Sequence, residues 1–349
     1  MFQTASRFLA DSVDFITVEL VFEGLVTSSV TVHRDKLTEL ALSTAPSSDL
    51  ISHLEIKDAK TDIDLVAEQA RLSWGIAPYL EYSLFDPLAP IMGEVGVKFT
   101  SKYKFSSAMS VQGEIRKSIF NNYNANTRVS DSVLPRVRSE SNLYNQQGDP
   151  GITSLTFQSL NKLSPNTYSR LTFGYLEEMF AGLSGEILWK PVDENWGLGV
   201  EINHVAQRDF DQSFGLRDYR TTTGHVSAYF DFQEGYSAQI DVGQYLAKDK
   251  GGTFTFAREF GNGWRVGGYF TLTDVPFQDF GEGSVDKGIF LTIPLDWSHG
   301  QPSSATSQIN IVPISRDGGA RLNVKNRLYG LVKDAHKPAL VREVARFWK

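Results

Sequence analysis

The sequence of 349 residues contains no cysteine. A disulfide-stapled scaffold and a thiolate zinc site are therefore both excluded. No apolar run approaches the roughly 18 residues that a transmembrane helix needs. Basic residues are too few for a nucleic-acid partner, because 34 Lys and Arg stand against 41 Asp and Glu and the pI is about 5.5. The mean hydropathy of −0.23 is typical of a soluble protein, but it also fits a transmembrane β-barrel, whose apolar and polar residues alternate.

Recognisable site motifs are also scarce. The six His residues show no metal-ligand spacing, and no glycine motif for phosphate binding lies between a strand and a helix. We therefore expect no metal and no cofactor. The first fifteen residues lack a basic stretch followed by an apolar run, so they predict no signal peptide.

Residues 1–60 differ in pattern from the rest of the chain. Two strands are predicted at 15–21 and 26–33, a helix follows at 34–42, and a third short strand is predicted at 54–56. This pattern indicates a small α/β module.

From about residue 64 the helical period disappears and apolar residues alternate with polar ones. In one example, Trp196, Leu198, Val200 and Ile202 alternate with Gly197, Gly199, Glu201 and Asn203. Strands of about ten residues follow one another without helices between them, which predicts an antiparallel meander. Short turns such as 193–195, 233–235, 250–252 and 261–263 alternate with long polar links near 121–134, 145–151, 206–218 and 274–287. We predict about 14 strands within residues 61–328, with a last strand at 321–328.

The alternation alone leaves open which face is apolar. A barrel of about 14 strands is too wide for side chains to fill, so an apolar interior would be empty. A polar lumen and a lipid-facing exterior are therefore expected, with aromatic residues near the strand ends. The alternative is a large soluble β-sandwich.

The C-terminal part is basic. Residues 316–349 contain nine Lys and Arg and three Asp and Glu, a net charge of +6 within a chain of −7. We predict a helical tail at 329–349, broken at Pro338. Its cations either rest on anionic headgroups or form a solvated helix face.

Long stretches of the predicted barrel resemble one known family. They include LTFGYLEEMFAGLSGEILWKP at 171–191, TTGHVSAYFDF at 222–232 and RLSWGIAPYLEYSLFDP at 71–87. These stretches are similar to the YjbH/GfcD family of Gram-negative outer-membrane β-barrel proteins, which is tied to exopolysaccharide and group 4 capsule export. The resemblance covers roughly residues 62–320.

The resemblance implies an outer-membrane location with residues 1–60 in the periplasm. It also implies polysaccharide, outer-membrane lipid, a periplasmic protein and a lipoprotein of the same export system as partners. Family members are longer and begin with a leader, so the chain is expected to be a C-terminal portion of a longer precursor.

Two long polar links carry the candidate site. Carboxylates and Arg groups next to aromatic rings suit sugar hydroxyls and the apolar faces of pyranose rings. The candidate glycan or pore-loop contacts are Arg208, Asp209, Asp211, Arg217, Asp218, Asp274, Asp279, Glu282, Asp286 and Lys287. The alternative is that these charges pair with one another to hold the loops.

Two functions remain open, and neither is enzymatic. The barrel either passes, or helps to assemble, a polysaccharide at the outer membrane, or it is a non-conducting scaffold that docks periplasmic proteins. The polar lumen pattern and the lack of an obvious plug sequence favour the first. Acidic pairs spaced for a glycosidase occur in any acidic loop, so no catalytic residue is predicted.

Overall fold

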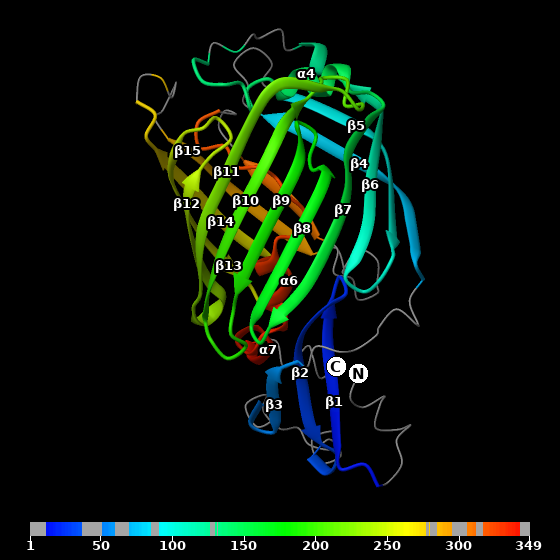
Figure 1. Cartoon of the computed structure of the whole chain (residues 1–349), viewed down its shortest axis with the longest axis vertical. Helices are drawn as coiled ribbons and strands as arrows, with labels where there is room; N and C mark the ends of the chain where they lie inside the picture. Colours follow the sequence, from blue (N-terminus) through cyan, green and yellow to red (C-terminus); the bar gives the residue numbers. More distant parts are fainter. Residues whose placement is uncertain are drawn as a thin grey trace.

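A computed structural model of the chain describes residues 12–36, 51–59, 70–84, 91–125, 130, 132–276, 279, 285–294, 306–311 and 317–342. Two antiparallel sheets make up most of it (Figure 1). The smaller sheet contains β1 (Phe15–Phe22), β2 (Leu25–His33) and β3 (Leu54–Asp58) in that order. It lies beyond one end of the larger sheet. The three strands predicted in this part of the sequence are present, whereas most of the predicted helix at 34–42 lies outside the described residues.

The larger sheet is a meander of thirteen strands in which each strand pairs with its sequence neighbours. The strands are β4 (Leu72–Leu84), β5 (Ile91–Lys104), β6 (Met109–Asn121), β7 (Gly151–Ser164), β8 (Thr167–Tyr175), β9 (Phe180–Trp189), β10 (Trp196–Arg208), β11 (Leu216–Asp231), β12 (Tyr236–Gln244), β13 (Lys250–Glu259), β14 (Arg265–Thr273), β15 (Asp286–Pro294) and β16 (Thr306–Ile311). The sheet curves around an interior, which we call the lumen (Figure 1).

The strand count and the closure differ from the prediction of a closed barrel of about 14 strands. Among the described residues, β4 and β16 are edge strands and do not pair with each other. The predicted last strand at 321–328 has no strand conformation, because this segment lies inside the lumen. The predicted turn at Lys250–Gly251–Gly252 forms the start of β13, and the turn itself precedes it at 245–249.

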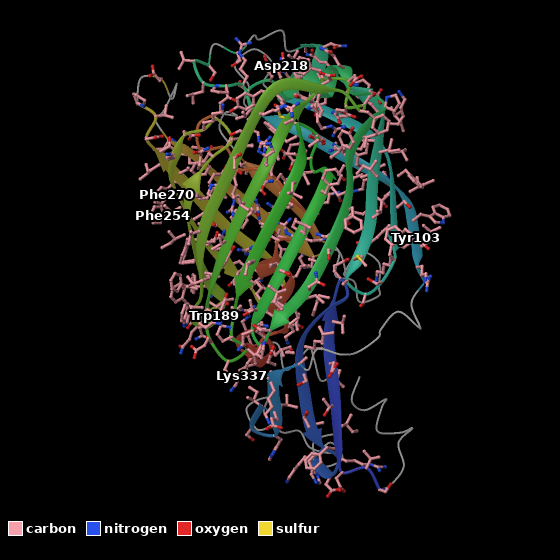
Figure 2. All side chains as sticks on the ribbon, viewed as in Figure 1. Tyr103, Trp189, Asp218, Phe254, Phe270 and Lys337 are labelled. Carbon is pink, nitrogen blue, oxygen red and sulfur yellow. The ribbon has the colours of Figure 1, made fainter. Side chains whose placement is uncertain are left out.

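The apolar face of the larger sheet points outward. In β10, Val200 is 55% exposed and Ile202 62%, whereas Glu201 and Asn203 are 3% and 1% exposed. The stacked rings of Phe254 and Phe270 also lie on the outer surface (Figure 2). The sheet therefore has a polar interior and an apolar exterior, as the sequence predicts.

The two ends of the lumen differ. We call the end with the link 209–215 and α4 (Ser141–Gln147) the upper end, and the end with the turns 190–195 and 232–235 the lower end (Figure 1). Exposed aromatic rings gather at the lower end, where Trp189 and Trp196 lie 4.9 Å apart between ring centroids and Trp264 follows a turn. This matches part of the predicted aromatic rim. Tyr245 also lies next to a strand end, at the upper end, but it is completely buried.

The remaining helices are short. They are η2 (Tyr123–Ala125), η3 (Gln233–Gly235), α6 (Leu328–Val332), η4 (Lys333–Ala335) and α7 (Lys337–Arg342). No helix in the described ranges is long and apolar enough to span a membrane.

Candidate functional site

Four charged side chains lie buried on the lumen face of neighbouring strands. Arg170 of β8 is fully buried and donates hydrogen bonds to Glu186 of β9 at 2.9 Å and to Glu201 of β10 at 3.2 Å. Asp241 of β12 lies on the same face and is 2% exposed. These four wall residues therefore comprise three carboxylates and one guanidinium, which contacts two of the carboxylates. Such a buried group is stable only with further cations nearby.

The further cations come from the C-terminal segment, which we define as residues 317–342. Arg327 donates to the two carboxylate oxygens of Glu201, at 2.8 Å from Nε and 3.1 Å from Nη2. Arg321 pairs with Asp241 at 2.8 Å. With Arg170 and Glu186 these groups form a network of three cations and three anions, so the charges balance only when the segment lies in the lumen.

The upper end of the C-terminal segment is also fixed. The Asp317 carboxylate accepts backbone N–H hydrogen bonds from Val137, Arg138 and Ser139, at 2.8, 2.8 and 3.0 Å. These residues belong to the link that precedes α4. The segment is thereby attached to the upper loops before it enters the lumen.

The segment reaches the lower end as α6, η4 and α7. Tyr329 stacks on Tyr229 of the wall with ring centroids 3.9 Å apart, and its hydroxyl donates to Asp231 at 2.7 Å. Lys333 pairs with Glu259 at 3.4 Å. The segment therefore contacts the wall from the upper to the lower end, and Figure 1 shows α6 and α7 at the lower end.

This arrangement corrects two expectations for the basic tail. The described cations face wall carboxylates instead of lipid headgroups, and only some of them are solvated. Lys325 and Lys337 are the half-exposed ones: Lys325 pairs with Glu114 at 3.2 Å, and Lys337 pairs with Asp193 at 3.0 Å at the lower end (Figure 2). The segment is also the plug that the sequence was expected to lack.

The three-stranded sheet packs against the lower end of the lumen. Lys162 of β7 donates to the Asp58 carboxylate at 2.6 Å and to the carbonyl of Ala59 at 2.8 Å. The Ser28 hydroxyl donates to the carbonyl of Ala335 in η4. A hydrophobic cluster joins the two parts and consists of Ile16, Val30, Val32, Ile56 and Val192, with Leu340 and Val341 of α7 against it.

A buried histidine lies at this junction. His336 is completely buried, and its Nε2 is 3.2 Å from the hydroxyl of Tyr168. Burial, together with the nearby ammonium groups of Lys190 and Lys162, lowers the pKa of His336 to about 3. The imidazole is therefore neutral at physiological pH, and protonation opposes the docked position of the segment.

The sequence-predicted residues of the 206–218 link mostly hold the upper loops together. Arg208 is fully buried and donates to the backbone carbonyls of Glu177 and Gln212, both at 2.8 Å. The Asp211 carboxylate accepts a hydrogen bond from the backbone N–H of Ser213 at 3.0 Å. Asp209 closes the same loop, since its backbone N–H donates to the carbonyl of Gly215 at 3.1 Å.

The two remaining residues of this group, Arg217 and Asp218, lie in β11 and not in the link. Arg217 pairs with Glu140 at 3.1 Å and lies 4.3 Å from the ring centroid of Phe210. Asp218 is exposed at the upper end (Figure 2). Asp211 and Asp218 are therefore the exposed candidates of this group, and Asp211 already accepts a hydrogen bond.

The second predicted group is divided by the fold. Asp274 and Asp279 line one cleft of about 520 Å³ at the upper end, together with Lys248 and Asp249. Asp286 and Lys287 lie in β15 and not in the link, and Glu282 lies outside the described residues.

Burial raises the pKa of Asp249 in this upper cleft, although its carboxylate accepts the backbone N–H of Gly319 at 2.7 Å. Among the described residues, no group of three or more His, Asp or Glu is arranged to hold a metal ion. The upper cleft therefore offers hydrogen-bonding oxygens without a metal centre.

The buried charges of the lumen are the functional residues that the sequence analysis missed. The sequence signal that could have found them is the uneven distribution of charge: residues 316–349 carry a net charge of +6, and the rest of the chain carries −13.

Comparison with known proteins gives the family. The model described as "YjbH: Exopolysaccharide biosynthesis protein YbjH" matches residues 1–334. The chain belongs to this family. It is 35% identical over 275 residues to the "Uncharacterized lipoprotein YjbH" of Escherichia coli strain K12, with 76% of this chain covered. The alignment covers only 39% of that relative.

Two solved structures show a weak likeness. One is the Salmonella typhi OmpF complex with daunomycin, with a TM-score of 0.32 and 8% identity over 63% of this chain and 85% of the other. The other is Acinetobacter baumannii OccAB2, with a TM-score of 0.30 and 9% identity over 89% and 92% of the two chains. Likenesses at this level do not bear on the function of this YjbH-family chain.

Proposed function

We propose that this YjbH-family chain is an outer-membrane β-barrel protein of a Gram-negative bacterium that takes part in exopolysaccharide or capsule export. The apolar exterior carries this proposal. A curved antiparallel sheet with Ile202 and Val200 more than half exposed and Glu201 buried is stable where lipid covers its outer face. Water on that face would leave a large apolar surface uncovered. The three-stranded sheet at the lower end then lies in the periplasm.

The occupied lumen supports a closed resting state. The C-terminal segment contacts the wall along its length, and its cations balance the wall carboxylates. A polymer chain would therefore pass only after this segment moves. Of the two roles considered from the sequence, the non-conducting scaffold that docks periplasmic proteins fits this geometry better, and transport of a polymer through the lumen requires a displaced segment.

The partners follow from this position. Lipid contacts the outer face, and polysaccharide meets the upper cleft. Among the described residues β1 is an edge strand of the three-stranded sheet, and this edge faces a periplasmic protein or lipoprotein of the same system. No enzymatic step is assigned to the chain.

Fractionation tests the location. Recovery of the full-length protein with outer-membrane vesicles, released only by detergent, is expected. Recovery in the soluble fraction without detergent would refute the lipid-facing assignment.

Conductance in planar lipid bilayers tests the closed lumen. The intact protein is expected to conduct little current, whereas a variant without residues 317–349 is expected to form an open pore. Because the deletion removes much packing, the double variant R321Q/R327Q provides a milder second test, with frequent openings expected. Large steady conductance of the intact protein would contradict the closed state.

A further inference from the structure

A cleft of about 260 Å³ lies at the lower end of the lumen, between the wall and the C-terminal segment. It is bordered by the β11–β12 turn, by the facing ends of β13 and β14, and by α6 to α7. Its central lining residues are Asp231, Tyr236, Glu259, Arg265, Tyr329 and Lys333. The volume is slightly below the range of about 300–1,000 Å³ for small-molecule sites, so it suits one or two sugar rings and not a long chain.

The charged residues of this lower cleft differ in whether they already have a partner in the protein. Glu259 already pairs with Lys333 and with Arg342, both at 3.4 Å. Asp231 accepts the hydroxyl of Tyr329. Arg265 is different, because within the described ranges it forms no ion pair, and its guanidinium lies 5.2 Å from the ring centroid of Phe290. A half-buried cation thus lines the cleft without an anionic partner.

The shape of the cleft is fixed before any ligand binds, because contacts within the protein hold its lining. Tyr329 is held by its stacking on Tyr229 and by its hydrogen bond to Asp231, so its ring keeps a fixed place in the lining. Phe232 adds a second ring, which is 51% exposed. Rigid aromatic groups next to carboxylate and guanidinium groups suit the apolar faces and the hydroxyls of a sugar.

We infer that the lower cleft binds an acidic sugar residue, of the hexuronate class, and that Arg265 contacts its carboxylate. A guanidinium forms two parallel hydrogen bonds with a carboxylate, which a neutral sugar cannot offer. Of the other anions in the lining, Glu259 and Asp334 pair with Lys333, and Asp231 accepts a hydrogen bond from Tyr329. Glu234 is exposed to solvent, which screens its charge, so these anions do not outweigh the attraction of Arg265. The inference rests on the proposed role in polysaccharide export and adds the class of polymer to it.

Isothermal titration of the purified full-length protein in detergent tests the lower cleft. The probes are a galacturonate tetramer and, as its neutral counterpart, cellotetraose. The acidic tetramer is expected to bind, and the neutral one to bind at least about tenfold more weakly. R265Q is expected to weaken binding of the acidic tetramer about 10- to 100-fold, as the loss of a charge-assisted contact predicts.

Two further variants control this test. R220Q removes an exposed arginine of β11 far from the cleft, and binding is expected to stay unchanged. R265K keeps the charge but loses the paired geometry, so an intermediate affinity is expected, and it serves in place of R265Q if that variant does not fold. Heat-modified migration on gels reports the folding of each variant.

The outcomes separate the two proposals. Equal binding of both tetramers, or unchanged affinity in both R265Q and R265K, would overturn the acidic-sugar site while leaving the outer-membrane role intact. A soluble protein in the fractionation experiment would instead overturn the proposed function.

Discussion

Glu201 is the residue on which the lumen network depends most. Its carboxylate accepts hydrogen bonds from Arg327 at 2.8 and 3.1 Å and from Arg170 at 3.2 Å, and it lies 3.7 Å from Arg321. In Glu201→Gln the side chain keeps its shape and loses its charge. Arg321 retains Asp241, but Arg327 is left without an anionic partner at comparable distance.

The magnitude follows from the burial. Breaking one side of a buried ion pair costs about 3–5 kcal/mol, because the remaining charge is desolvated and unpaired. Part of this loss of free energy weakens the docking of the C-terminal segment, because the segment leaves the lumen more easily than the wall unfolds. Since about 1.4 kcal/mol corresponds to a tenfold change in an equilibrium, we expect the segment to open at least about 100-fold more often in E201Q.

The absence of cysteine provides the assay. Ala320→Cys introduces a single thiol into a position of the C-terminal segment that is 7% exposed. The rate of its modification by a maleimide then reports opening of the segment. Asp193→Asn is the matched control, since it removes an exposed ion pair with Lys337 and is expected to change the rate by less than about fivefold.

A double variant tests whether the unpaired charge of Arg327 is what opens the segment in E201Q. In E201Q/R327Q the stranded cation is gone, and Arg170–Glu186 and Arg321–Asp241 remain paired. The double variant is therefore expected to open less often than E201Q alone. A rate in E201Q within threefold of the parent, or strictly additive effects in the double variant, would refute the network as the holding element.

Three shorter predictions concern other parts of the molecule. The pKa of His336 is about 3 in the folded protein against about 6.5 in an unfolded chain, so the neutral imidazole stabilises the docked segment above pH 6.5. This stabilisation is lost as the pH falls, by about 2 kcal/mol at pH 5. The thiol assay is therefore expected to show faster opening at pH 5, and H336Q is expected to remove this pH dependence. Gly24→Ala, at φ +88°, would place a Cβ 1.8 Å from the carbonyl oxygen of Ser107 and is expected to increase hydrogen exchange in the 105–108 turn, whereas Gly261→Ala, with open space, is expected to have little effect. Ile202→Arg on the outer face is expected to cost about 2–4 kcal/mol in urea unfolding from lipid vesicles, and equal stability would contradict a lipid-facing position.

Alternation in the sequence predicted most of the strands, and together with the expected width of the barrel it predicted that the polar face points inward. The pattern around Glu201 and Ile202 has a period of two, and a polar interior is the only way to fill a wide barrel. Turn positions were less predictable. Gly251 and Gly252 are typical of a turn, yet they lie in β13, where Gly251 closely approaches the backbone of the neighbouring β14.

The C-terminal segment was misassigned for a physical reason. Between 321 and 328, polar residues alternate with apolar ones except at Asn326, which is also the pattern of a strand with one polar and one apolar face. In the lumen, Arg321 and Arg327 contact wall carboxylates, while Leu322 and Val324 pack in a cluster with Val137 and other buried residues. Side chains alternate with a period of two both in an extended chain inside a lumen and in a strand of a barrel. Only the residues that the segment contacts in the folded protein distinguish the two.

The lower end of the molecule links the lumen to the three-stranded sheet. The apolar residues of α7 share one hydrophobic cluster with the three-stranded sheet, and η4 accepts a hydrogen bond from Ser28 of β2. If the C-terminal segment leaves the lumen, α7 must separate from this cluster or carry the small sheet with it. A protein that binds the exposed edge of β1 therefore acts on the same packing that keeps the lumen filled. Its binding energy would favour or oppose the closed state according to whether it keeps Leu340 and Val341 covered.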